Sequence, residues 1–311
     1  MSPDVYCYLQ QGKKAKAVLA PSLGGWLLGY ARSFEERWEE ALYWSPAVVD
    51  RYPQEMYAGN PVLFPLVSKN RVGEREHHYA WEDRIYPLPQ HGLARRRPWA
   101  VVRQEAEAVT LELTDDGDTR GVYPFSFRYR LTYRLEAGRL HWEQRVENPG
   151  PGPLPFSSGF HPYFYVPLGP AGRRTEGWVH LPRCRAVTPV GFWEKTRQTD
   201  RPPFDLSVNK PFEGTLFFTE LERREVTLTD PTRGVGLRLN WEGAPAYRYL
   251  ALWTRSPEAP FFCLEPWTAL PNSFTTRDDL VVLEPGEVFQ AAFWLDVERL
   301  EEKDLTTKNN N

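Results

Sequence analysis

The sequence predicts an all-β protein, formed as one large antiparallel β-sandwich with one or two short helices. Composition supports this class, because the chain combines 12 Trp, 15 Tyr and 17 Phe with 29 Pro. Aromatic residues favour pleated surfaces, while proline is confined to turns, loops and strand edges. Period-two hydrophobic alternation recurs along the chain. The sequence lacks the alternation of strands with long helices that would predict a parallel α/β sheet.

The clearest alternation lies in residues 125–147, FSFRYRLTYRLEAGRLHWEQRVE. Apolar and polar residues alternate on both sides of EAGR, whose glycine is typical of a tight turn. This period places the apolar side chains on one face of each strand. The segment therefore predicts a β-hairpin with one buried face.

More strands are predicted toward the C-terminus. Residues 224–241, REVTLTDPTRGVGLRLNW, repeat the alternation around the turn sequence DPTRG. Residues 247–254 and 260–268 are more apolar and predict central strands, and residues 284–298 predict a turn and a last strand.

Residues 33–44, SFEERWEEALYW, differ from this pattern. Ser33 and Glu36 have the spacing of a capping box, and the composition favours a helix. We therefore expect a short helix here. With 311 residues, the chain is long enough for one large domain, which we place at residues 1–300, followed by a polar tail at residues 301–311.

Charge and cysteine content exclude several protein classes. The formal net charge is −3, which provides no general attraction to nucleic acid or acidic membranes. The three cysteines, Cys7, Cys184 and Cys263, form no CxxC pair, so neither a disulfide framework nor a structural zinc site is predicted. No stretch approaches the ~20 apolar residues of a membrane span, and the first residues lack the apolar core of a signal peptide. We expect a cytoplasmic monomer or homodimer.

Two segments rich in apolar and aromatic residues carry side chains suited to proton transfer. His161 lies among aromatic residues in SSGFHPYFYV, where a core histidine, a metal ligand and a proton donor are all compatible with the pattern. Glu265 follows apolar residues in FFCLEPWT, where burial should raise its pKa, unless it pairs with a buried arginine. A carboxylate that accepts a proton and an imidazolium that donates one are complementary near neutral pH.

A polar turn is predicted in PLPQHGLARRRPW, residues 87–99. Gln90, His91 and Arg95 lie within six residues, followed by two further arginines. The pattern fits a solvated basic loop as well as a polar rim for hydroxyl or phosphate groups, since guanidinium binds phosphate bidentately.

Two pairs of consecutive polar residues lie in sequences that are less specific for a function. Asn70 and Arg71 follow an apolar strand in LFPLVSKNRVGE, a position that suits either sugar hydroxyls or a surface turn. His77 and His78 would point to opposite faces of a strand, which favours a solvated loop over a metal site. No GxSxG, GxxxxGK[ST] or GxGxxG motif offers another type of chemistry.

Taken in order, these motifs resemble the aldose 1-epimerase (galactose mutarotase-like) superfamily. The resemblance covers about residues 59–297, through GNPVLFPLVSKNR, YPLPQHGLAR, SSGFHPYF, FFCLEPWT and LEPGEVFQAAFWLDV. It implies a large antiparallel β-sandwich with a sugar cleft. It also implies interconversion of the α and β anomers of a hexose, by acid/base ring opening and closure, without a metal or cofactor.

The resemblance also implies roles for individual residues. Glu265 corresponds to the general base, His161 to the acid that protonates the ring oxygen, and His91 to a second histidine that contacts the sugar. Asn70 and Arg71 correspond to a pair that binds hydroxyl groups.

Gln90, Arg95 and Trp267 complete the expected substrate-binding set. The sequence QHGLAR resembles the hexose-6-phosphate epimerase branch, in which the arginine helps to hold phosphate, whereas FHPYF and LEPWT are closer to the branch that acts on free sugars. A segment in which many relatives carry a sugar-contacting aspartate has Gly214 and Thr215 here, and Glu213 is a candidate replacement.

Three alternatives to an epimerase of a free hexose remain. A 6-phosphate substrate requires at least two converging cations, for which Arg71, Arg95 and Arg96 are candidates. A non-catalytic carbohydrate-binding protein would use the same residues only as hydrogen-bond partners. A glycoside hydrolase would need a second carboxylate, Asp83 or Glu143, facing Glu265. The sequence assigns no role to residues 31–58, which are longer than the family pattern requires; a lid and a dimer contact both fit.

Overall fold

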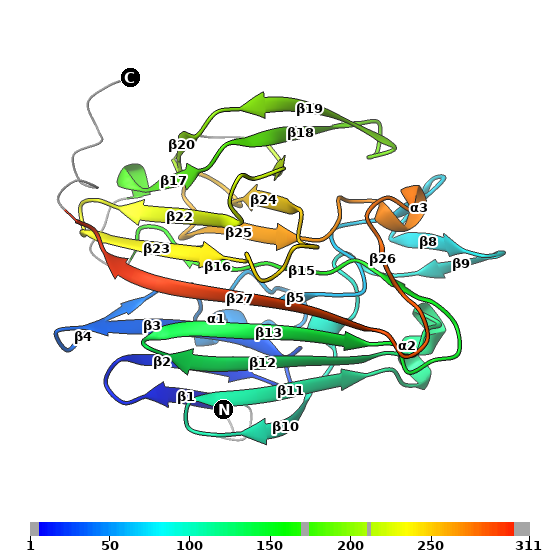
Figure 1. Ribbon diagram of the computed structural model, residues 1–311, viewed down its shortest axis with the longest axis horizontal. Helices are drawn as coiled ribbons and strands as arrows, with labels where there is room; N and C mark the ends of the chain where they lie inside the picture. The colour runs from blue at the N-terminus through cyan, green and yellow to red at the C-terminus, as the bar shows by residue number, and fades with distance from the viewer. Residues whose placement is uncertain (1–5, 169–173, 210–212, 302–311) are drawn as a thin grey trace.

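The computed structural model describes residues 6–168, 174–209 and 213–301, so most of the predicted polar tail lies outside the described residues. As predicted, these residues form antiparallel β-sheets with only short helices (Figure 1). None of the helices in the described ranges has the length and apolar character needed to cross a membrane.

Two large sheets carry most of the strands. The first has nine, in the order β10 (Ala100–Gln104), β11 (Ala108–Thr114), β12 (Arg128–Glu136), β13 (Arg139–Glu147), β27 (Val288–Arg299), β23 (Val235–Asn240), β22 (Glu225–Asp230), β17 (Trp178–Leu181) and β20 (Phe204–Ser207). The second has eight: β19 (Lys195–Arg201), β18 (Cys184–Val190), β21 (Leu216–Thr219), β24 (Tyr249–Trp253), β25 (Phe261–Trp267), β15 (Gly159–Phe160), β5 (Val62–Leu63) and, paired with β25, β16 (Tyr163–Tyr165).

Smaller sheets and helices extend this framework. A four-stranded sheet contains β1 (Cys7–Gln11), β2 (Ala15–Ala20), β3 (Trp26–Phe34) and β4 (Arg37–Glu40). The two-stranded sheets are β14 (Leu154–Phe156) with β26 (Val281–Leu283), β6 (Arg71–Val72) with β7 (Arg75–Glu76), and β8 (His78–Trp81) with β9 (Arg84–Pro87). The α-helices are α1 (Pro46–Val49), α2 (Gly117–Val122) and α3 (Ser273–Thr276).

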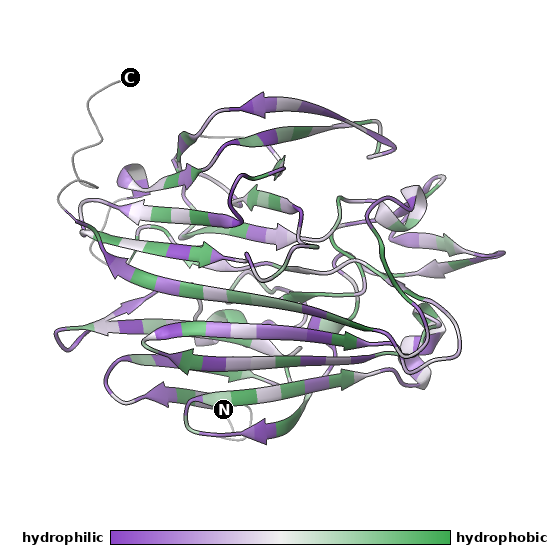
Figure 2. Ribbon diagram, viewed as in Figure 1, coloured by the Kyte–Doolittle hydropathy of each residue, from purple (hydrophilic) through white to green (hydrophobic). Residues whose placement is uncertain are grey.

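The predicted hairpin over residues 125–147 is confirmed as β12 and β13. Leu135 pairs with Leu140, and the intervening Ala137 and Gly138 both have positive φ. Such φ angles are those of the tight turns that suit the twist of a hairpin. Figure 2 shows the resulting alternation of hydrophilic and hydrophobic residues along these strands.

The helix predicted over residues 33–44 is wrong, because this segment contains the end of β3, the turn of the β3–β4 hairpin and β4. Glu35 and Glu36 have φ angles of 50° and 67° and form its turn. Glu39 of β4 is buried against Arg233, at an Oε2–Nη2 distance of 2.6 Å. Strand pairing and this long-range ion pair override the local preference for helix. The short α-helices α1, α2 and α3 lie elsewhere in the described residues.

An aromatic cluster joins the two large sheets. Trp142 and Phe293 of the nine-stranded sheet stack with ring centroids 5.2 Å apart. Phe160 of the eight-stranded sheet meets both rings edge-on, at 5.6 Å and 4.9 Å. Fully buried aromatic side chains contribute large apolar areas, so this cluster holds the two sheets face to face.

The turn that carries His91 is positioned by a close backbone approach. Gly92 has a φ of +74°, and a Cβ at this residue would lie 2.2 Å from the carbonyl oxygen of Phe64. The same oxygen accepts hydrogen bonds from the N–H groups of Leu93 and Ala94, at 2.9 Å and 3.0 Å. Only glycine allows this contact without moving either segment.

We predict that Gly92→Ala lowers the free energy of unfolding by about 1–3 kcal/mol or more, because it combines an unfavourable φ with a backbone clash. Gly117→Ala is the matched control, since Gly117 has open space around its Cβ position. The control should be neutral or stabilising by up to about 1 kcal/mol. Urea unfolding midpoints test the pair, and equal midpoints would contradict the structural role of Gly92.

Candidate functional site

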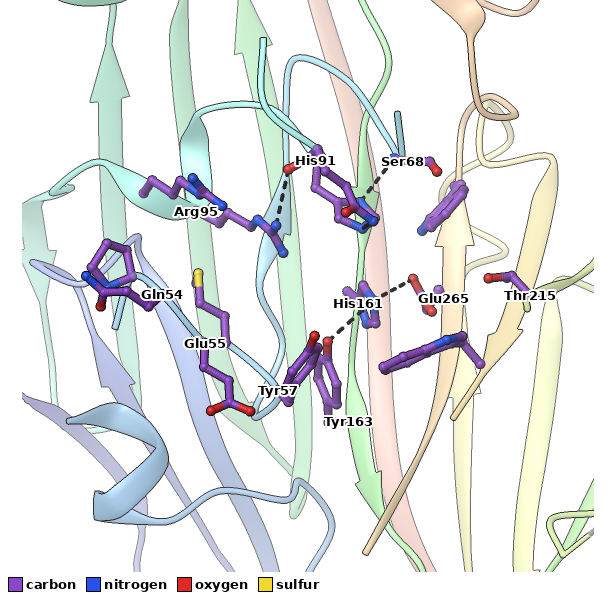
Figure 3. A pocket seen from close by; sticks show the side chains of 16 residues that line it. Gln54, Glu55, Tyr57, Ser68, His91, Arg95, His161, Tyr163, Thr215 and Glu265 are labelled. Atoms are coloured by element: carbon purple, nitrogen blue, oxygen red, sulfur yellow. Dashed lines mark hydrogen bonds and ion pairs between the residues drawn. The ribbon is translucent and has the colours of Figure 1, made fainter. Parts of the chain in front are cut away.

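A cavity of about 300 Å³ lies against the eight-stranded sheet (Figure 3). Strand β25 shows why polar groups face it. Phe262 and Leu264 belong to the main hydrophobic core, whereas Cys263, Glu265 and Trp267 alternate with them and face the other side. A segment before β5 and the turn after β9 form other parts of the lining. The complete set of lining residues is Pro53, Gln54, Glu55, Met56, Tyr57, Ser68, Gln90, His91, Arg95, Arg96, His161, Tyr163, Thr215, Trp253, Glu265 and Trp267.

The structure brings six of the eight predicted site residues together in this cavity. They come from three separate parts of the chain: Gln90, His91, Arg95, His161, Glu265 and Trp267. Asn70 and Arg71 are not among the lining residues.

His161 and Glu265 lie in contact at the centre of the lining. His161 Nε2 is 3.3 Å from Glu265 Oε2, and the two side chains are 8% and 1% exposed. The imidazole ring also stacks on Tyr163, with the ring centroids 4.6 Å apart and the planes inclined by 3°. The stacking fixes the ring orientation, so that Nε2 faces the carboxyl group (Figure 3).

Burial shifts the pKa values of this pair in opposite directions. Desolvation raises the pKa of Glu265 well above its usual range, against smaller opposing effects of the Trp267 indole N–H and the Arg95 charge. Desolvation, assisted by Arg95, lowers the pKa of His161 to about 3. Burial thus favours the protonated carboxyl of Glu265 and the neutral imidazole of His161. This neutral pair holds as many protons as a glutamate–imidazolium ion pair, so the two states differ only by a proton shift.

His91 is held in a defined tautomer. Its Nδ1 accepts a hydrogen bond from the Ser68 backbone N–H at 3.0 Å. Burial, followed by the positive charge of Arg95, lowers the pKa of His91 well below its ordinary value, so the ring is neutral. In a neutral imidazole whose Nδ1 accepts, Nε2 carries the proton, and this nitrogen lies 3.3 Å from the side-chain amide of Gln90. His91 can therefore donate a hydrogen bond from Nε2.

Arg95 supplies a largely buried cation beside these groups. Its Nη2 donates to the Gln90 backbone oxygen at 3.1 Å, and its Nε has no hydrogen-bond partner in the described structure. Burial lowers the pKa of Arg95 to about 10, so the side chain remains charged near pH 7. Arg96 is exposed and also lines the cavity.

Asn70 and Arg71 instead connect neighbouring segments. Asn70 Oδ1 accepts from the backbone N–H of Phe274 at 2.9 Å. The Arg71 guanidinium lies 4.3 Å from the centroid of the Phe192 ring and 3.3 Å from Glu194 Oε1. These contacts place both side chains beside the cavity-forming elements rather than in the lining.

Residues 53–57, within the segment whose role the sequence left open, form one side of the cavity. Glu55 pairs with Arg255 at 3.1 Å, and the Arg255 guanidinium lies 5.1 Å from the centroid of the Tyr57 ring. Sequence reasoning missed these lining residues, because neither their composition nor their spacing distinguishes them from an ordinary loop. Their contacts with the segment after β24 could not be read from the local pattern.

The remaining candidate residues are also placed. Thr215 lines the cavity, whereas Glu213 is exposed and outside its lining. Asp83 and Glu143, the possible second carboxylates of a glycoside hydrolase, are exposed and do not line it either. His78 begins β8, and the preceding His77 has a φ of 59°, as in a turn.

Comparison with known proteins agrees with this architecture. The family model for aldose 1-epimerases matches residues 8–296. The chain belongs to the aldose 1-epimerase family. Among its relatives is protein LacX of Lactococcus lactis, 26% identical over 227 residues, a region that spans 68% of this chain and 74% of LacX.

Solved structures of similar fold include two further bacterial proteins. The galactose mutarotase related enzyme of Lactobacillus acidophilus has a TM-score of 0.78 and 21% identity, covering 96% of this chain and 98% of that one. A galactose mutarotase-like protein of Lactobacillus casei has a TM-score of 0.76 and 24% identity, covering 94% and 100%. These similarities show that this aldose 1-epimerase family member has the galactose mutarotase-like fold.

We predict that His161 of this family member, whose pKa is lowered to about 3, stays neutral from about pH 8 to about pH 5. The pKa of His91 should likewise lie well below its ordinary value, because burial disfavours the charged form of both rings. Imidazole chemical shifts in two-dimensional NMR, assigned with His161→Gln and His91→Gln, provide the measurement. The urea-unfolded protein is the control, since its imidazoles should titrate near 6.5. A midpoint near that value for either ring in the folded protein would contradict the shift.

Proposed function

We propose that this protein is an aldose 1-epimerase that interconverts the α and β anomers of a hexose, with Glu265 and His161 as its proton-transfer pair. The observation that carries the proposal is the 3.3 Å contact between His161 Nε2 and Glu265 Oε2 inside the cavity. A proton acceptor and a proton donor this close can both reach the anomeric centre and ring oxygen of one pyranose. Simple sugar binding would not require such a pair.

The dimensions of the cavity support a single sugar as the substrate. About 300 Å³ is at the lower end of the ~300–1,000 Å³ typical of small-molecule sites. Trp253 and Trp267 supply aromatic surface for the apolar face of a pyranose. His91 Nε2 and the Arg95 guanidinium supply hydrogen-bond donors for its oxygen atoms.

The reaction proceeds with a closed proton balance. The Glu265 carboxylate takes the proton of the anomeric hydroxyl while the bond between C1 and the ring oxygen breaks, and the His161 imidazolium donates a proton to that oxygen. The product is the open-chain aldehyde, which rotates about its C1–C2 bond. Closure on the other face of the carbonyl reverses both transfers and gives the other anomer.

The pKa shifts fit this cycle. Ring opening begins from the glutamate–imidazolium pair and ends with neutral Glu265 and neutral His161, the charge state that burial favours. The protein therefore stabilises the stage that accompanies the open-chain sugar. The same environment makes the ion pair less stable, and the contact between the two side chains permits the proton shift that forms it.

We predict that Glu265→Gln and His161→Asn each slow enzymatic anomer exchange by about a hundred- to ten-thousandfold, the usual contribution of a general acid or base. Saturation-transfer NMR with glucose and galactose measures the exchange. Glu143→Gln, an exposed change on β13 outside the cavity, is the control and should leave the rate unchanged. Sugar binding without any acceleration by the unmodified protein would instead indicate a carbohydrate-binding protein.

A hexose 6-phosphate is the second candidate substrate, and the position of Arg95 favours it. Arg95 and Arg96 provide two cations in the lining, and the Nε of Arg95 is buried without a hydrogen-bond partner in the described parts of the chain. A phosphate group would bind such a guanidinium through charge-assisted hydrogen bonds.

If phosphate is recognised here, Arg95→Gln should raise the KM for glucose 6-phosphate by about ten- to hundredfold, and much less for glucose, because a hydrogen bond to a charged group contributes ~1.5–3 kcal/mol. Arg97→Gln is the matched control, since Arg97 is outside the lining and pairs with Asp116. Equal effects on both sugars would contradict phosphate recognition and assign Arg95 to sugar hydroxyls.

The reducing cytoplasm is the compartment that we propose for this activity. Cys7, Cys184 and Cys263 are all buried and free of disulfides. Free thiols are typical of proteins in reducing compartments.

A further inference from the structure

Cys263 is a buried nucleophilic group that the proposed reaction does not use. It lies two residues before Glu265 on β25, so both side chains are on the same face of the strand. Ligand atoms of His161, Cys263 and Glu265 all lie within 4.8 Å of one another. An imidazole nitrogen, a sulfur and a carboxylate oxygen are thus gathered at one point beside the cavity.

Polar atoms in this group lack partners. Apart from the 3.3 Å contact between Glu265 Oε2 and His161 Nε2, Glu265 Oε2 and His161 Nδ1 have no hydrogen-bond partner among the described residues. Cys263 is completely buried with a free thiol. Buried polar groups of native proteins are normally hydrogen-bonded, so unsatisfied atoms at one location indicate a function or a ligand. Because His161 and Glu265 line the cavity, a small ligand can reach the group from solvent.

We propose that His161, Cys263 and Glu265 form a binding site for a thiophilic divalent cation such as Zn²⁺, which inhibits the enzyme by occupying its proton-transfer pair. Nitrogen, sulfur and oxygen donors together match the ligands that Zn²⁺ uses in proteins. The cation is an inhibitor and has no part in the reaction. The inhibition rests on the proposed epimerase function, whereas the binding does not.

The spacing of the donors is close to that of a tetrahedral site. Zn–N, Zn–O and Zn–S bonds of ~2.0–2.3 Å place neighbouring ligand atoms roughly 3.3–3.8 Å apart. His161 Nε2 and Glu265 Oε2 are already 3.3 Å apart. The outer limit of 4.8 Å requires movements of about 1 Å or less to close the triad. The fourth position is left for water or a sugar oxygen.

The charge balance also suits a buried site. Binding of one Zn²⁺ displaces one proton from the Cys263 thiol and one from the Glu265 carboxyl, and both protons pass to the solvent. The two anionic ligands then neutralise the two charges of the cation, while His161 binds as neutral imidazole. A complex without net charge avoids the large cost of burying an isolated ion.

Hard cations should be rejected by the same donors. Mg²⁺ and Ca²⁺ prefer six or more oxygen ligands, whereas this triad offers a single carboxylate. Cys263 is therefore the residue that gives the site its preference for thiophilic metals. Mg²⁺ provides a control for nonspecific effects of a divalent charge.

The test uses the full chain, freed of metal by a chelator and titrated with Co²⁺ as a spectroscopic substitute for Zn²⁺. We expect one Co²⁺ per chain, with a thiolate-to-cobalt charge-transfer band in the near ultraviolet that Zn²⁺ abolishes and Mg²⁺ does not. Surface histidines cannot produce this band, because it requires a thiolate ligand. In parallel, saturating Zn²⁺ should slow anomer exchange at least tenfold, and EDTA should restore it.

Cys263→Ser and Cys263→Ala should lose the cobalt band and become resistant to Zn²⁺ while retaining metal-free activity. Cys184→Ser, a change at another buried free cysteine, is the matched control and should behave as the unmodified protein. Circular dichroism verifies that each variant is folded. Because one of the two Cys263 variants could fail to fold, the serine and the alanine variant are both measured.

The outcomes separate the two proposals. Absence of the band in the folded protein, or its persistence in the Cys263 variants, overturns the metal site. A cobalt band in a protein without epimerase activity supports the metal site and overturns the proposed function. Epimerase activity that Zn²⁺ leaves unchanged overturns the inhibition.

Discussion

The site depends on the alternation of side chains along β25 and along the neighbouring strand β15 with the residue that follows it. Phe262 and Leu264 face the core between the sheets, and Phe160 packs there against Trp142 and Phe293. Residues next to these core side chains must face the opposite side of the sheet. The packing that stabilises the sandwich therefore also sets the positions of the proton-transfer groups. A shift of one residue in register would turn Glu265 into the apolar core.

Burial then determines the chemical state of these groups. A desolvated Glu265 favours its protonated form and a desolvated His161 its neutral form, and the cation of Arg95 adds to the effect on the histidine. Their contact keeps one exchangeable proton within a protected cavity. The same features, namely close donors without solvent, also make the pair receptive to a thiophilic cation once Cys263 is included.

Loops complete the cavity around this rigid centre. Residues 53–57 form one side, and Gly92 lets the turn that carries His91 approach β5 closely. Strands position the reactive groups, while loops provide the surfaces that select the sugar. This division is common among enzymes whose scaffold is rigid and whose binding surfaces are formed by loops.

The fold class, the hairpin over residues 125–147 and the burial of Glu265 and His161 could be predicted from the sequence, because alternation and local apolar surroundings are properties of neighbouring residues. The sequence could not determine the β3–β4 hairpin, whose buried Glu39 pairs with Arg233, 194 residues away. Nor could it place Asn70 and Arg71 outside the cavity lining, or bring Cys263 to His161. Such contacts form only when the chain folds, since they join segments that are distant in the sequence.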